Sequence, residues 1–351
     1  MANKRTYWAI QGLGTAAHGT GPSITEYDYA PGIQSVGMST NFNLEQIFQL
    51  GQLEIYQDLE EVPDIELTIE RAMDEHALFY VRAVGHAEVG GGTPYDAGIK
   101  TLTGTQNNRA DVYFAVYSDG FENAGDVEPD AACYMSGMFC SSASFNFGTD
   151  GFFTESVSLV GESQIWNAPG VGETFDGAPT SVDLHTGAVS KRQHFRFFDA
   201  TQVPEPLATL DADLDDFKIP SISVSVDFGR EQMFSLGQRQ AYHRYVTFPI
   251  EVTCDIEAYV TDVADMAVKV HAEDDNTSEQ KIKFIVAAGP VDNLHAGGAV
   301  IHTFDLGEKN RLSSITWNGI STDGTNATIT YSYRNFNKLD VTTAATTNDN
   351  G

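Results

Sequence analysis

Polar and apolar side chains alternate along several segments of the chain. Residues 64–70 and residues 250–257 each switch between polar and apolar at every position. A period of two places the two kinds of side chain on opposite faces of a β-strand. Within 141–161, an Asp-Gly turn joins two further alternating segments, which is typical of a hairpin. The pattern predicts a mainly β protein, and residues 75–85 are its candidate for a short helix.

An unusual passage occurs twice. "FNLEQIFQLGQ" at 42–52 and "FGREQMFSLGQ" at 228–238 share seven of eleven residues. Further pairs of similar segments follow in the same order, and we list them here: 33–42 with 219–228, Ile65-Glu66-Leu67-Thr68 with Ile250-Glu251-Val252-Thr253, 111–120 with 281–290, and 141–161 with 312–332. Four matches in one order predict an internal duplication of a β domain.

The repeat also predicts the domain organisation. We expect a first β domain at 1–170 and a second at 213–351, each with a short helix. Residues 171–212 have no partner in the repeat and are rich in Gly, Pro and Asp, so we expect a linker or a long inserted loop there. The polar tail after residue 340 is expected to be loosely held.

The charge balance narrows the function classes. The chain has 49 acidic and 20 basic residues, for a net charge of −29. Direct binding of nucleic acid needs clustered Lys and Arg, so this charge argues against it. The simpler interpretation of the acidic excess is that it keeps the protein soluble or suits a salty medium. The more specific interpretation is that it forms a surface that repels DNA.

Acidic residues gather on the polar faces of two predicted strands: Asp64, Glu66 and Glu70 in one, and Glu251, Asp255 and Glu257 in the other. An ordinary antiparallel strand also has a solvated outer face. Neighbouring carboxylates repel each other, however, and ordinary surfaces mix in lysine. Lysine is absent from both strands, which favours a channel or cleft where negative potential is useful.

Four glutamines of the repeated passage, Gln46, Gln52, Gln232 and Gln238, are candidates for hydrogen bonds across an interface between domains or subunits. The alternative is that they satisfy backbone groups in a tight local turn.

The sequence signals for a nucleotide, calcium or zinc site are weak. Gly12-x-Gly14-x-x-Ala17 imitates a dinucleotide fingerprint, but glycine and proline follow where a helix should start. An aspartate run at 211–216 lacks the glycine and final glutamate of an EF-hand. Cys133, Cys140 and Cys254 match no zinc spacing, so we expect buried, reduced thiols. We therefore expect no enzyme activity, no metal site and no cofactor. We also expect no signal peptide and no membrane span.

Residues 32–74 resemble the signature of tail tube proteins of tailed bacteriophages, and 150–166 are similar to the hairpin that closes the domain in that family. The resemblance implies a mainly β fold of two tandem tail-tube-like β-sandwich or split-barrel domains. It also implies rings that stack into a tube through which DNA passes without specific binding. Six domains usually surround the hole, so three doubled chains would close a pseudo-hexamer; a hexamer is the alternative.

The resemblance further implies location in the virion tail, assembly in the host cytoplasm, and other tail proteins as partners. The acidic strands would then line the tube's lumen. A trimeric baseplate hub or distal tail protein with the same doubled domain is a close rival. A β-sandwich carbohydrate-binding module is another, with its site built on exposed aromatic residues such as Trp8, Trp166 and Trp317.

Overall fold

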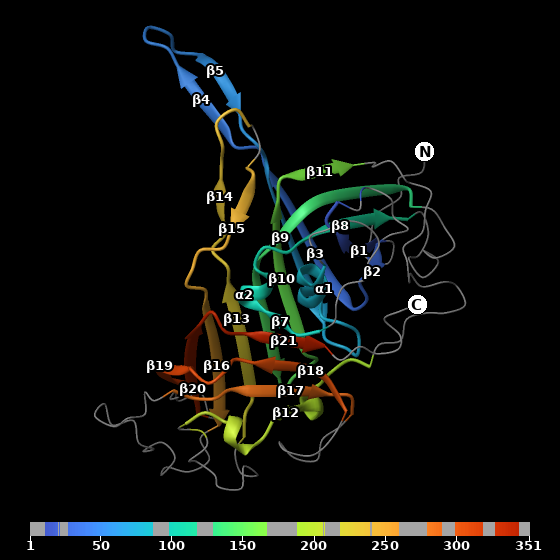
Figure 1. Ribbon diagram of the computed structural model, residues 1–351, viewed down its shortest axis with the longest axis vertical. Helices are drawn as coiled ribbons and strands as arrows, with labels where there is room; N and C mark the ends of the chain where they lie inside the picture. The colour runs from blue at the N-terminus through green and yellow to red at the C-terminus, as the bar shows by residue number, and fades with distance from the viewer. Residues whose placement is uncertain are drawn as a thin grey trace.

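A computed structural model of the chain describes residues 11–19, 21, 27–86, 98–117, 129–166, 188–205, 207, 218–238, 241–259, 279–289, 299–318 and 327–343. Within these ranges the protein is mainly β, as predicted, with the short helices α1 (Phe79–Gly85) and α2 (Leu102–Thr105) (Figure 1). Helix α1 lies inside the predicted segment 75–85. In this part of the chain, no helix is both long and apolar enough to cross a membrane.

Eight antiparallel strands form the main path of a 12-stranded sheet, in the order β19-β20-β16-β13-β9-β10-β6-β3. Alternating sequences bury one face of the inner strands β6, β10, β13, β16 and β20, whereas no residue of the end strands β3 and β19 is fully buried. The strands are β3 (Ile33–Asn41), β6 (Asp64–Ala72), β9 (Ala131–Gly148), β10 (Thr154–Gly161), β13 (Ser221–Asp227), β16 (Glu251–Tyr259), β19 (Arg311–Asn318) and β20 (Thr328–Phe336).

A second layer of strands and two long hairpins complete the fold. Strand β9 pairs with β10 and β13 through its C-terminal part, and with β8 and β11 through its N-terminal part. Gly137 lies between these parts with φ +67°, a backbone conformation that residues with a Cβ rarely adopt. The remaining strands are β1 (Gln11–Ala17), β2 (Asp28–Tyr29), β7 (Lys100–Thr101), β8 (Arg109–Val116), β11 (Ser163–Trp166), β12 (Phe195–Phe197), β17 (Lys283–Ala287), β18 (Val300–Asp305) and β21 (Asp340–Thr343), with the hairpins β4 (Leu44–Phe48)–β5 (Ile55–Glu60) and β14 (Glu231–Met233)–β15 (His243–Tyr245).

The order of hydrogen-bonded strands occurs twice. In the large sheet, β19-β20-β16-β13 is followed by the same arrangement, β9-β10-β6-β3. In the second layer, β1-β8-β9-β11 corresponds to β12-β17-β18-β21. We call β1–β11 the first unit and β12–β21 the second unit. Because β13 pairs with β9, the two units follow one another head to tail in a single sheet.

Individual hydrogen bonds repeat as well. Pairing of β9 with β10 skips Ser141, and its hydroxyl donates to the carbonyl oxygen of Ser158 at 3.1 Å. Pairing of β19 with β20 skips Ser313, whose hydroxyl donates to the Ser332 carbonyl at 2.8 Å. Two copies of one β-bulge with one side-chain bond therefore fix which positions of the units are equivalent.

In one strand, the residues that the structure makes equivalent between the two units differ by two positions from those that the sequence alignment paired. Ser35 donates to Glu70 at 3.0 Å, and Ser221 donates to Glu257 at 2.8 Å. Glu70 therefore corresponds to Glu257, and the register of β6 and β16 makes Asp64 the equivalent of Glu251. Since the shift is an even number, each side chain still lies on the predicted face.

The two units share their core. The ring of Phe147, from β9 of the first unit, lies 5.2 Å from Phe284 and 5.3 Å from Phe304 of the second unit, between centroids. Strand β7 of the first unit also pairs with β21 of the second. Strand β12 comes from the predicted linker 171–212 and pairs with β17, while residues 171–187, 206 and 208–212 lie outside the described ranges.

Candidate functional surfaces

The polar face of the large sheet carries hydroxyls and carboxylates. Cross-strand partners follow one row from β6 to β16: Glu70, Ser156, Ser144, Ser225 and Thr253. Neighbouring hydroxyls bond each other, as in Ser225 and Thr253, whose oxygens are 2.6 Å apart. The six predicted acidic residues, Asp64, Glu66, Glu70, Glu251, Asp255 and Glu257, all project to this face by the register of their strands.

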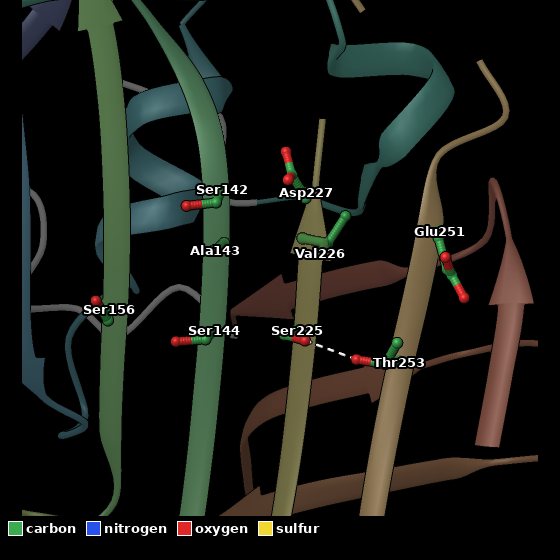
Figure 2. A pocket seen from close by; sticks show the side chains of 9 residues that line it. All are labelled: Ser142, Ala143, Ser144, Ser156, Ser225, Val226, Asp227, Glu251 and Thr253. Carbon is green, nitrogen blue, oxygen red and sulfur yellow. Dashed lines mark hydrogen bonds between the residues drawn. The ribbon is translucent and has the colours of Figure 1, made fainter. Parts of the chain in front are cut away.

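A shallow depression of about 330 Å³ lies in this face. Figure 2 shows its lining: serines of β9, β10 and β13, Thr253 on β16, and the carboxylates of Asp227 and Glu251 toward one end. None of the nine lining residues is aromatic, although sugar and drug-like ligands are usually bound against aromatic or apolar walls. The depression is therefore best described as part of the polar face.

The junction of the two units is built by β13 and β9. Val224 lies opposite Phe145 and Ser225 opposite Ser144, and the backbone N–H of Phe228 donates to the Ser141 carbonyl at 2.9 Å. Phe145 and Phe228 are buried there, with exposed fractions of 0% and 1%. The sheet is thus continuous and closely packed across the junction.

The base of the hairpin β14–β15 lies on the first unit beside this junction. Arg244 binds Asp64 at 2.5 Å and Glu162 at 3.4 Å, and Gln232 donates to Asp64 at 2.6 Å. Burial alone raises the pKa of Asp64, but hydrogen bonds from Arg244, Asn43 and Gln232 outweigh it and hold the pKa below its ordinary value. Gln232 therefore does bond across two units, within one chain, and Asp64 is tied into the same contact.

The other predicted amides lie on exposed hairpin positions. Gln46 is in β4, while Gln52 and Gln238 end tight turns in which their N–H groups donate to Gln49 and Ser235, each at 3.1 Å. Each turn has a glycine at positive φ, which only glycine adopts without strain. Backbone hydrogen bonds thus close both turns, and the bonds expected of the glutamine side chains there stay a prediction.

The hairpin β4–β5 projects away from the sheets (Figure 1), and its apolar side chains are exposed. Every residue of both strands is exposed. At the tip, Leu50 and Leu53 each have a relative exposure of 102%, and Phe48 has 63%. Soluble monomers rarely expose this many large apolar side chains on one element, so the hairpin is a candidate contact surface.

A buried carboxylate that sequence reasoning missed lies at the bend of β9. Asp111 is fully buried and accepts five hydrogen bonds of 2.8–2.9 Å, from the His18 ring, Tyr134, Ser136 and the N–H groups of Gly19 and Gly137. Ser136 and Asp111 both face His18 Nδ1. A nucleophilic triad needs serine and aspartate on opposite ring nitrogens, so this cluster is an anchor rather than a catalytic site.

Three further sequence features are candidates for a nucleotide, metal or zinc site: the glycines near the N-terminus, the aspartate run and the cysteines. Gly12 and Gly14 lie inside strand β1 rather than in a strand-to-helix turn, so the nucleotide fingerprint has no structural counterpart. The aspartate run at 211–216 lies outside the described ranges, and the described residues hold no group of acidic, His or Cys side chains that suits a metal. All three cysteines are buried, and burial raises the thiol pKa of each, to about 12 for Cys140.

Exposed tryptophans do not form one platform. Trp166 ends β11 and Trp317 is in β19, two strands that lie far apart in Figure 1, while Trp8 lies outside the described ranges. The aromatic face expected of a carbohydrate-binding module is therefore not assembled from these two residues.

Comparison with known proteins adds no assignment: neither a protein-family model nor a curated protein matches the chain.

Proposed function

We propose that this chain is a structural ring subunit whose copies join head to tail through strands β3 and β19. These two strands are the ends of the eight-strand path, so one edge of each has no paired strand among the described residues. Exposed strand edges invite pairing with another chain. The β13–β9 junction within the chain is the template for the β3–β19 junction between chains.

The observation that carries this proposal is a difference in burial between equivalent positions. Phe145 on β9 is 0% exposed, and its equivalent on β19, Trp317, is 42% exposed. Phe228, after β13, is 1% exposed, and its equivalent after β3, Phe42, is 65% exposed. The free edges thus carry the large apolar side chains of a packed junction without the strand that would cover them.

The template also gives the register between chains. Ser225 lies opposite Ser144 inside the chain, and their equivalents are Ser39 on β3 and Thr316 on β19. Met38 would then lie opposite Trp317, and Asn41 opposite Ser314. One junction repeated in a fixed rotation closes a ring when the rotation divides a full turn.

In such a ring the polar face would surround the hole, and its carboxylates would repel DNA phosphates so that DNA slides through without specific binding. Three chains would supply six units. Rings that stack would form the tail tube of a virion, with the projecting hairpins between them and other tail proteins at its ends. Long tubes in negative-stain images favour this function over that of a single-ring hub.

The test is a disulfide between chains. The double variant Ser39→Cys, Thr316→Cys should give covalent dimers and trimers on non-reducing gels under mild oxidation. Ser39→Cys with Ser314→Cys is the matched control, because a shift of two residues separates the Cα atoms beyond disulfide reach. Native thiols are buried and should contribute little background. Equal crosslinking of both variants, or none in either, would contradict the proposed junction.

A further inference from the structure

The two hairpins carry opposite charge. Residues 42–62 contain Glu45, Glu54, Asp58, Glu60 and Glu61 and no Lys or Arg. Residues 228–248, their equivalents, contain Arg230, Arg239 and Arg244 against a single acid, Glu231. The repeated passage thus kept its shape while its charge was inverted, and the surfaces that receive the hairpins show why.

The positive hairpin is received by an acidic surface on the first unit, which we call the first seat: Asp64, Phe139 and Glu162. Arg244 makes ion pairs with both acids. The Arg230 guanidinium lies 5.1 Å from the centre of the Phe139 ring and donates to the Cys140 carbonyl at 2.8 Å. Both arginines are therefore held by groups of the neighbouring unit.

Equivalent hairpin positions follow from the register. Gln232 lies opposite Arg244 in the second hairpin, and Gln46 lies opposite Asp58 in the first. Asp58 thus takes the place of Arg244. Arg244 is 6% exposed, whereas Asp58 is exposed. The acidic hairpin accordingly presents its base to solvent, and within the described residues no Lys or Arg forms an ion pair with Asp58.

The equivalent receiving surface on the second unit keeps one acid, Glu251 in the place of Asp64, but its net charge is positive. The β-bulge places Arg311 where the first unit has Phe139, and Arg334 where it has Val160. Arg311 and Arg334 lie directly opposite each other on the free edge, an arrangement of like charges that weakens a sheet. Glu251 lies 3.8 Å from Arg334 and offsets one of the two charges. One positive charge remains.

We propose that Arg311, Arg334 and Glu251 form a second seat, which receives the acidic β4–β5 hairpin of another copy of this chain. The inference rests on the proposed ring and adds its selectivity. An acidic hairpin is repelled by the acidic first seat, and the arginine-bearing hairpin by the second seat. Each hairpin therefore fits one seat only, which enforces alternation of the units and prevents one chain's first hairpin from displacing another's second.

The test is a charge reversal followed by its compensation. Asp58→Arg and Arg311→Asp, each alone, should raise the protein concentration needed for half-maximal ring formation at least tenfold, measured by mass photometry. The combined variant Asp58→Arg, Arg311→Asp should return to within about threefold of wild type. Glu54→Arg is the matched control, because it makes the same charge change in the same hairpin but next to the tip.

The outcomes separate the two proposals. If the wild type forms rings and Asp58→Arg forms them equally well, the second seat is wrong and the ring stands. If the combined variant is no better than either single one, the charge pairing is also wrong. A wild type that stays monomeric at every concentration removes the ring and the seat together. Thermal melting of each variant should match wild type, since Asp58 and Arg311 are exposed in the single chain.

Discussion

At the scale of single residues, Asp111 shows how one buried charge organises a bend. Its carboxylate accepts hydrogen bonds from His18 and Gly19 in the loop after β1, and from Ser136 and Gly137 in the turn of β9. A buried carboxylate is stable only when donors replace its lost water. Here five donors do so, and they hold two layers of strands together at the point where β9 passes between them.

Replacement of Asp111 by Asn should lower the free energy of unfolding by about 3 kcal/mol, because an amide brings its own N–H groups against five donors. Urea denaturation of the two proteins measures the difference. Asp150→Asn, in an exposed turn, is the matched control and should stay within about 0.5 kcal/mol of wild type. A loss of less than about 1 kcal/mol for Asp111→Asn would show that the cluster is not an anchor.

The same carboxylate predicts a pH dependence. Burial alone raises the pKa of Asp111, but bonds from His18, Gly137 and Ser136 hold it below its ordinary value. The unfolded group titrates near ~3.9, so its stabilising contribution is complete above about pH 5 and is lost as pH falls through the lower folded pKa. The stability gap between wild type and Asp111→Asn should therefore shrink below about pH 4 in urea titrations; a gap that widens there would contradict the assignment.

At the scale of elements, local pattern found the strands but not their long-range pairing. Alternation in 64–70 and 251–257 predicted the faces of β6 and β16 correctly, since a side chain's face depends only on odd or even position. The alignment there was wrong by two residues, because hairpin lengths absorb such shifts. Nothing local marks His18, Asp111 and Ser136 as neighbours, or β9 as one strand shared by two layers, because those contacts depend on residues far apart in sequence.

The tip of the β4–β5 hairpin supports a prediction about assembly alone. Leu50 and Leu53 are fully exposed in the single chain. Leu50→Ser with Leu53→Ser should therefore leave the unfolding free energy within about 0.5 kcal/mol of wild type. If the tip contacts a neighbouring ring, the variant should shorten tubes in negative-stain images while rings persist. Tubes of unchanged length would exclude the tip from stacking, and Thr149→Ser in an unrelated turn serves as the control.

At the scale of the whole molecule, duplication of the unit gives the chain two kinds of junction. One joins the two units within the chain, and the other would join units of different chains in the proposed ring. In the proposed ring, the inner junction, β13 with β9, is the template for the outer one, β3 with β19. Repetition of the strand order, of the serine at the bulge and of the Ser–Glu bond argues that both junctions descend from one geometry. Sequence alone predicted the duplication; which edges stay free required the strand order.

The chain has a net charge of −29, and part of its acidic excess lies on the polar face. The proposed ring would turn this face toward its hole. Glu66→Lys with Asp255→Lys reverses charge on that face in both units while leaving the second seat intact. We expect tubes to assemble, to bind double-stranded DNA at low salt, and to slow DNA ejection at least several-fold in reconstituted particles. Glu54→Lys with Asp150→Lys makes the same net change away from the polar face and should leave ejection unchanged. Equal ejection rates for the two double variants would place the polar face outside the DNA path, because phosphate repulsion acts over about one Debye length, ~8 Å at physiological salt.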